Sequence, residues 1–258
     1  MKLKVLDLFS GIGGFSLGLE RTGGFETVAF CEIEPFPRRV LAKHWPDVPC
    51  YDDVRTLTAE RLAADGIAVD VITGGFPCQD ISTSGRRAGI EDGTRSGLWS
   101  EIARLVREIR PKFVIVENVS NLLGGPSDKP GRWFGRVLGD LAALGYDAEW
   151  HCIPASRLGR TIRRDRVWII AFPNEAGFTF YDDLLAGADQ FRARASSDLG
   201  EAIDCGGFGT VIVPADLRVE HGLSDKLVLA RIGACGNAVV PQIPELIGRA
   251  ILEARIAA

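Results

Sequence analysis

The sequence lacks the residue groupings that metal sites and disulfide scaffolds need. It has six cysteines but no pair with C-x-x-C spacing, and it has only three histidines. Neither a zinc site nor a disulfide framework is therefore expected in a chain of 258 residues. It also lacks an apolar run approaching the roughly 20 residues of a membrane span, and its N-terminus has no signal-peptide pattern. We expect a cytoplasmic protein that binds no metal and no membrane.

An excess of positive charge, common in enzymes that act on nucleic acids, is absent as well. The formal net charge is -4, but basic residues concentrated on one face can still bind nucleic acid. One such run lies between His151 and Phe172, where the arginines are Arg157, Arg160, Arg163, Arg164 and Arg166. From composition alone, this run is either a solvated surface or a nucleic-acid-binding face.

What the sequence does contain is an alternation of short apolar runs with helical patterns. Strands are expected at 3–9, 27–33, 69–75, 112–119, 146–153 and 165–172, and helices at 15–23, 96–110, 131–144 and 239–256. Such alternation is typical of βαβ units in a mostly parallel sheet. We therefore predict an α/β fold with a main domain formed by residues 1–172 and completed by 229–258. Residues 173–228 show no clear periodicity and are predicted to form a small irregular lobe.

A glycine-rich loop follows the first strand in DLFSGIGGFSLGLE, residues 7–20. Glycine permits positive φ and close approach to a ligand, and the helix start that follows favours a negative group. Glu32, at the end of the second strand, can accept both hydroxyls of a ribose. A carboxylate in Tyr51-Asp52-Asp53-Val54 can accept a hydrogen bond from an adenine amino group. Each acid alone can be a surface carboxylate, but in this order they indicate a nucleoside cofactor. A nicotinamide is the weaker alternative, because the full G-x-G-x-x-G fingerprint is missing.

A cysteine in a polar, glycine-rich turn follows the third strand, Cys78 in GGFPCQDIS (74–82). A single cysteine is usually an inert apolar residue, but this open loop favours a reactive thiol. Thiolate addition to carbon 6 of a cytosine would make carbon 5, otherwise a poor nucleophile, able to attack a methyl sulfonium.

Protonation of the cytosine ring nitrogen N3 would assist that addition. Glu117 follows an apolar strand, where partial burial would raise its pKa and keep it protonated, and Asn118 can hold the backbone of the cysteine loop. Arg166 is the candidate to contact the cytosine carbonyl oxygen and to orient Glu117, while Arg164 would serve the same site or a phosphate.

With these residues assembled, the chain resembles the cytosine-C5 DNA methyltransferase family. The matching blocks stand in family order: DLFSGIGG (7–14), GGFPCQDIS (74–82), ENV (117–119), RRDRVWIIAF (163–172) and GNAVVPQ (236–242). The resemblance implies a Rossmann-like methyltransferase fold in which residues 173–228 recognise the DNA target. It implies methyl transfer from S-adenosylmethionine to carbon 5 of a cytosine flipped out of double-stranded DNA, as in restriction–modification systems. We expect a monomer.

The resemblance also implies which residues form the site. Cys78 attacks carbon 6, Glu117 contacts N3 and the exocyclic amine, and Arg164 and Arg166 surround the target base. The implied S-adenosylmethionine-binding residues are Phe9, Gly11, Ile12, Gly13, Glu32, Ile33, Asp53, Val54, Gly75, Pro77, Leu98, Asn237 and Ala238.

Two features depart from the family pattern. Ile162 stands where family members often carry glutamine, and residues 173–230 contain ten acids against four bases, a poor composition for gripping phosphates. Two alternatives therefore stay open beside the DNA enzyme: a binding protein that keeps the cofactor fold without turnover, and a tRNA cytosine methyltransferase of the same fold. A nicotinamide-dependent dehydrogenase is the least favoured interpretation, because its chemistry does not use the PCQ (77–79) and ENV (117–119) motifs.

Overall fold

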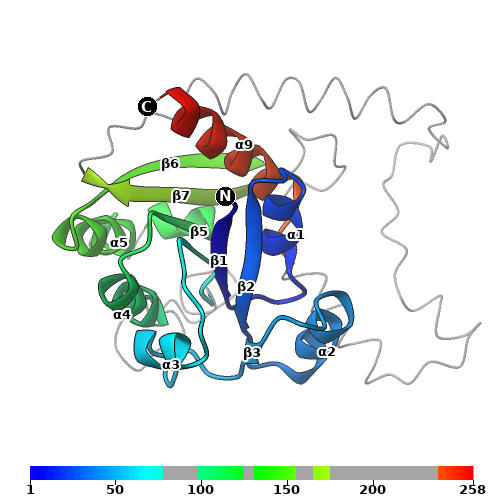
Figure 1. Ribbon diagram of the computed structural model, residues 1–258. Helices are drawn as coiled ribbons and strands as arrows, with labels where there is room; N and C mark the ends of the chain where they lie inside the picture. Colours follow the sequence, from blue (N-terminus) through cyan, green and yellow to red (C-terminus); the bar gives the residue numbers. More distant parts are fainter. Residues whose placement is uncertain (78–97, 125–130, 155–164, 175–237, 258) are drawn as a thin grey trace, which may run out of the picture.

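A seven-stranded sheet forms the centre of the molecule (Figure 1). The computed structural model describes residues 1–77, 98–124, 131–154, 165–174 and 238–257. The strands are β1 (Leu3–Leu8), β2 (Phe25–Cys31), β3 (Cys50–Tyr51), β4 (Val71–Gly74), β5 (Phe113–Val119), β6 (Tyr146–Pro154) and β7 (Asp165–Pro173). Their order is β3-β2-β1-β4-β5-β7-β6, and the first five pair in parallel. The predicted α/β fold with a mostly parallel sheet is confirmed.

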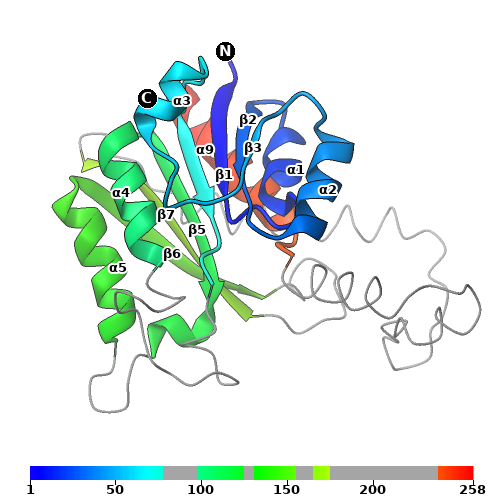
Figure 2. The same cartoon turned by 90° about the horizontal axis from the view of Figure 1, so that it is seen from below.

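Helices cover both faces of this sheet (Figure 2). They are α1 (Gly14–Glu20), α2 (Pro35–His44), α3 (Ala59–Ala64), α4 (Trp99–Ile109), α5 (Arg132–Ala143) and α9 (Gln242–Ala257), with a 3₁₀ turn, η2, at Ser120–Leu123. One core lies between the sheet and α3, α4 and α5, and the other between the sheet and α1 and α9. Because both faces of the sheet are covered, β1 has apolar side chains on both of its faces. Val5 lies in one core, and Leu6 and Leu8 lie in the other.

β7 runs against the direction of the other central strands. It lies between β5 and β6 and pairs antiparallel with both, so that Pro154 at the end of β6 stands opposite Asp165 at the start of β7. The ten residues between them, 155–164, are fewer than the dozen or more that a parallel crossover needs. The chain therefore turns back on itself, and the N-terminal end of β7 arrives at the edge where β5 ends.

The segment that leads into the C-terminal helix α9 packs directly against the backbone of α1. A Cβ on Gly14 would collide with the carbonyl oxygen of Val239, and a Cβ on Gly18 with that of Pro241. Glycine at these two positions of α1 lets residues 239–241 approach the helix closely. The segment that begins at Ala238 is thus held beside the helix that follows the glycine-rich loop.

Within the described ranges, no helix is both long and apolar enough to cross a bilayer. Those same ranges contain no cluster of three or more His, Cys, Asp or Glu side chains suited to a metal ion. The predicted lobe, residues 173–228, lies outside the described residues except for its first two.

Candidate active site

The carboxyl ends of four parallel strands meet at one edge of the sheet. In the strand register, Leu8 of β1 pairs with Cys31 of β2 and with Gly74 of β4, and Gly74 pairs with Val116 of β5. The segments that follow these strands carry most of the predicted site residues. In an open α/β sheet this edge is where ligands bind.

The glycine-rich loop after β1 has an unusual backbone. Phe9, Gly11 and Gly13 have φ values of 51°, 53° and 84°. Glycine adopts such angles freely, but in phenylalanine a positive φ is a strained conformation that costs on the order of 1–3 kcal/mol and is typical of functional sites. A Cβ on Gly11 would meet nothing within 4 Å, so the loop borders open space there. Ile12, between the two glycines, is partly buried.

Glu32 joins this loop to the end of β2. Its side chain accepts hydrogen bonds from the backbone N–H groups of Gly11 and Glu34, each 2.7 Å long, and the residue is 8% exposed. A carboxylate has about four lone-pair positions, so capacity remains for the two hydroxyls of a ribose. The neighbouring Ile33 is 60% exposed, an unusual position for an isoleucine, and offers an apolar surface beside that carboxylate.

The predicted adenine acid forms an ion pair. The Asp53 carboxylate accepts hydrogen bonds from Arg55 Nε at 2.9 Å and Arg55 Nη2 at 2.8 Å, and these bonds hold the pKa of Asp53 below its ordinary value. Val54 is 5% exposed, with its side chain in the core. The N–H of Glu32 donates to the carbonyl of Tyr51 at 2.9 Å, which joins the segment carrying Asp53 to the end of β2.

The segment that leads to Cys78 is fixed by the end of β5. Asn118 Nδ2 donates to the carbonyl oxygen of Phe76 at 3.1 Å, which confirms the expectation that Asn118 holds this backbone. A Cβ on Gly75 would lie 3.4 Å from Glu117 Oε2, so the carboxylate stands directly against the loop. Pro77 is partly buried and is the last described residue before Cys78.

Glu117 and Arg166 come together from antiparallel strands. Arg166 Nε lies 3.0 Å from Glu117 Oε1, and the two side chains are 23% and 11% exposed. The expected burial of Glu117 and its expected contact with Arg166 are therefore both present.

The remaining predicted site residues divide into two groups. Leu98 precedes α4 and packs against the core, and Ala238 is partly buried next to Val239. Cys78, Arg164 and Asn237 lie outside the described residues. The structure therefore brings together the segments on which the cofactor and base residues were predicted, and their roles stay predictions.

A buried polar cluster beneath the site was not predicted. Asp7 is fully buried, and its two carboxylate oxygens accept hydrogen bonds from Thr73 Oγ1 at 2.7 Å and Ser16 Oγ at 2.9 Å. Burial raises the pKa of Asp7 to about 7, against the hydrogen bonds from Thr73 and Ser16. The signal in the sequence was an acid between Leu6 and Leu8, in a strand whose other residues from Val5 onward are apolar.

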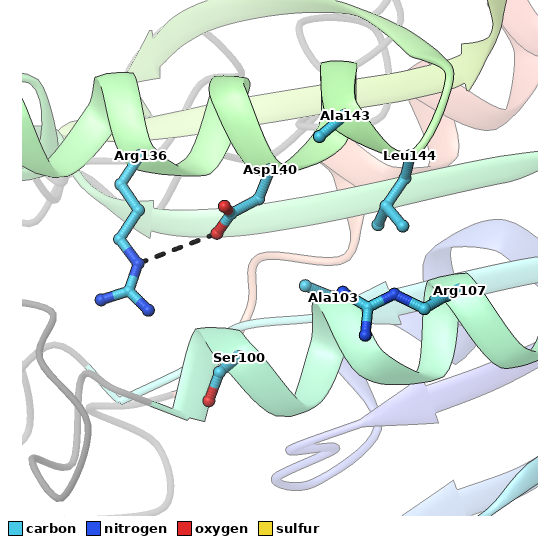
Figure 3. Close-up of a pocket in the computed structure, with 7 residues that line it drawn as sticks. All are labelled: Ser100, Ala103, Arg107, Arg136, Asp140, Ala143 and Leu144. Atoms are coloured by element: carbon cyan, nitrogen blue, oxygen red, sulfur yellow. Dashed lines mark ion pairs between the residues drawn. The ribbon is translucent and has the colours of Figure 1, made fainter.

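A cavity of about 300 Å³ lies elsewhere, between α4 and α5 (Figure 3). Its lining residues are Ser100, Ala103, Arg107, Arg136, Asp140, Ala143 and Leu144, none of which was predicted for the site. Asp140 accepts a hydrogen bond from Trp99 Nε1 at 2.8 Å and faces Arg136 at 3.8 Å. Asp140 thus serves the packing of the two helices, and we do not place the active site there.

Comparison with known proteins gives a consistent family. Residues 3–199 match the C-5 cytosine-specific DNA methylase family. The chain is 32% identical over 203 residues to the Type II methyltransferase M1.ScrFI of Lactococcus lactis subsp. cremoris, covering 79% of this chain and 50% of that protein. It is 36% identical over 194 residues to the Type II methyltransferase M.Sau3AI of Staphylococcus aureus, covering 69% of this chain and 45% of that protein. The chain thus spans about half the length of these relatives.

Solved structures give the same fold. A putative DNA modification methyltransferase encoded within a prophage of E. coli superposes with a TM-score of 0.57 at 28% identity, covering 69% of this chain and 49% of that one. The Dnmt2 methyltransferase of S. pombe superposes with a TM-score of 0.57 at 22% identity, covering 73% of this chain and 55% of that one, and supports the fold alone. The sheet is that of the Rossmann-like methyltransferases. From the extent of the family match and the identity to its members, the chain belongs to the C-5 cytosine-specific DNA methylases.

Proposed function

We propose that the chain transfers a methyl group from S-adenosylmethionine to carbon 5 of a cytosine in DNA. Cys78 is the nucleophile, Glu117 is the group that faces ring N3, and Arg166 orients Glu117 and contacts the carbonyl oxygen of the base. The target base is flipped out of the duplex, since carbon 6 is otherwise stacked. Residues 173–228 contribute to reading the DNA sequence.

The residues at the ends of β1 and β2 fit an adenosine-containing methyl donor. Open space borders Gly11, Glu32 keeps free lone pairs on a carboxylate held by two backbone N–H groups, and Ile33 exposes an apolar surface beside it. A carboxylate for ribose hydroxyls next to an apolar surface for a base suits a nucleoside. When bound, the donor supplies an electrophilic methyl group on a sulfonium.

The thiol and the carboxylate divide the chemistry of the base. The Cys78 thiolate forms a bond to carbon 6, and the electron pair of the 5,6 double bond becomes available at carbon 5. Carbon 5 takes the methyl group, its proton then leaves to a base, and the carbon–sulfur bond breaks to restore the thiolate. The protonated carboxyl group of Glu117 donates its proton to N3 as the thiolate adds and takes it back when the thiolate leaves, and Arg166 keeps the carboxyl group in place.

One observation supports this proposal most strongly, the position of Glu117. Its carboxylate stands against Gly75, three residues before Cys78, on one side and against Arg166 on the other. An acid fixed beside the cysteine-bearing loop is where a proton donor to the attacked pyrimidine is needed. A structural ion pair accounts for Arg166 alone and does not require the acid to stand against that loop.

Covalent trapping tests the proposal directly. The chain is incubated with S-adenosylmethionine and duplex DNA containing 5-fluorocytosine, in which carbon 5 keeps fluorine and the adduct is not released. Wild type is expected to form a protein–DNA adduct that survives denaturing gel electrophoresis, and Cys78→Ala is expected to form none. Cys152→Ala, a change at an exposed cysteine on β6, is the matched control and should trap as wild type does.

A second assay compares methyl incorporation from labelled S-adenosylmethionine into DNA and into tRNA. Incorporation into DNA alone supports the proposal, and incorporation into tRNA alone would replace DNA by RNA as the substrate. Binding of S-adenosylmethionine with no adduct and no incorporation would instead show a binding protein that has lost turnover.

A further inference from the structure

A charged cluster on α4 faces the turn that follows β3. Arg104 Nε lies 2.8 Å from Glu101 Oε2 and Arg104 Nη1 lies 2.8 Å from Glu108 Oε1, one helical turn to either side. An arginine flanked at i−3 and i+4 by acids has its guanidinium plane fixed, because each carboxylate holds a different nitrogen. The third nitrogen, Nη2, is left pointing away from α4.

Nη2 binds the backbone of the neighbouring turn. It donates to the carbonyl oxygen of Val54 at 2.9 Å and to that of Leu57 at 2.8 Å. The side chains of Val54 and Leu57 are buried in the core, while their carbonyl oxygens face Arg104 of α4. Buried or half-buried carbonyls need a partner, and the guanidinium supplies it for both.

Glu108, a member of the same cluster, also binds the start of α3. Its Oε2 accepts a hydrogen bond from the N–H of Ala59, the first residue of α3, at 3.1 Å. α3 lies beside α4 in both views (Figures 1 and 2). α4 therefore holds the backbone at three points, Val54, Leu57 and Ala59, over the stretch that begins with Asp53.

We propose that Arg104 is a positioning residue for the adenine end of the cofactor site. It acts through the main-chain carbonyls of Val54 and Leu57, which set where Asp53 stands relative to Glu32. α4 begins directly after Leu98, so this helix connects the turn that carries Asp53 with a second residue predicted for the cofactor pocket. The inference rests on the proposed function, because it assigns these segments to an adenosine-containing donor.

Calorimetric binding of S-adenosylhomocysteine and of S-inosylhomocysteine, which lacks the adenine amino group, tests the proposal without turnover. Wild type is expected to prefer the adenosine ligand. Arg104→Lys keeps a cation between Glu101 and Glu108, yet one ammonium cannot reproduce the fork that reaches both carbonyls. It is expected to bind S-adenosylhomocysteine about tenfold more weakly, as loss of a charge-assisted hydrogen bond implies, and to lose most of the preference over S-inosylhomocysteine.

Arg107→Lys is the matched control, since Arg107 lies on the same helix and lines the cavity between α4 and α5 (Figure 3). It should bind both ligands as wild type does. Unchanged affinity and unchanged preference in Arg104→Lys, with thermal unfolding showing a folded protein, would overturn the assignment of Arg104. If Arg104→Lys does not fold, Glu108→Gln, which loses only one member of the cluster, takes its place. The same two quantities then decide: its affinity for S-adenosylhomocysteine relative to wild type, and its preference for that ligand over S-inosylhomocysteine. A wild type that binds neither ligand would refute the proposed function itself, which separates the two failures.

Discussion

Replacing Asp7 by asparagine should change the pH dependence of folding more than the fold itself. Asp7 is fully buried, and burial, with a smaller contribution from the nearby Glu32 charge, raises its pKa from 3.8 to about 7. A carboxyl group whose pKa is raised in the folded state holds its proton more tightly there than in the unfolded chain. Folding stability is then highest below about pH 4 for this group and falls as pH rises toward 7.

The magnitude follows from the size of the shift. At about 1.4 kcal/mol per pKa unit, the change from 3.8 to about 7 corresponds to about 4 kcal/mol lost once the pH is above 7. Asparagine has nearly the same shape, can accept from one of the two hydroxyls of Ser16 and Thr73, and can donate to the other. The free energy of unfolding of Asp7→Asn minus that of wild type should therefore rise by about 2.5 kcal/mol between pH 5 and pH 8.

Urea unfolding followed by tryptophan fluorescence across that pH range measures the difference. Asp47→Asn, a change at an exposed aspartate, is the control and should follow the wild-type curve in parallel. A difference between Asp7→Asn and wild type that stays constant with pH would refute the reasoning, since it would mean that Asp7 takes up no extra proton on folding. A difference that shrinks with rising pH would mean that the hydrogen bonds outweigh burial.

Three further predictions concern packing and chemistry. Gly18→Ala should destabilise the protein by about 1–3 kcal/mol, because the added methyl group meets the Pro241 carbonyl oxygen. Gly139→Ala, in open space on α5, is the control and should not destabilise it. Equal melting temperatures of the two variants in thermal unfolding would contradict this prediction. Trp99→Phe should cost about 1 kcal/mol or more in urea unfolding by removing the indole hydrogen bond across the helices, and an unchanged midpoint would remove that bond from the stability of the domain. Glu117→Gln should lower kcat at least about tenfold while S-adenosylhomocysteine affinity stays as in wild type, and an unchanged kcat would place the assisting acid elsewhere.

The sequence predicted the sheet because its strands depend on local patterns, and the same patterns place the proposed site where the parallel strands end. Apolar runs ended by polar residues mark strands that run into loops, and Glu32 and Glu117 were both expected at strand ends. β2 ends at Cys31, two residues before the expected boundary, so that Glu32 leaves the strand and its carboxylate turns back to Gly11. A shift of this size at a strand end changes a side chain's direction without changing which edge it belongs to.

Contacts between distant segments were harder to predict. Arg104 reads in the sequence as one more charge on the solvent face of an amphipathic helix, and nothing near it indicates Val54 or Leu57, about 50 residues away in the chain. α2 begins with Pro35 and contains Pro37, two residues that obscure a helical pattern although proline is tolerated in a first turn. The short connection between β6 and β7 favours antiparallel pairing of these two strands, but no motif in the sequence places β7 beside β5.

Anchoring by long-range polar contacts is what the predicted loops share. Glu32 holds the glycine-rich loop through Gly11, and Asn118 holds the cysteine loop through Phe76. Arg104 holds the turn after β3 through the carbonyl oxygens of Val54 and Leu57. In each case a side chain from one segment satisfies the backbone of another, so the loops are positioned by neighbouring elements as well as by their own conformation. Because catalysis depends on geometry to within about an ångström, loss of an anchor should weaken binding or turnover well before it unfolds the sheet.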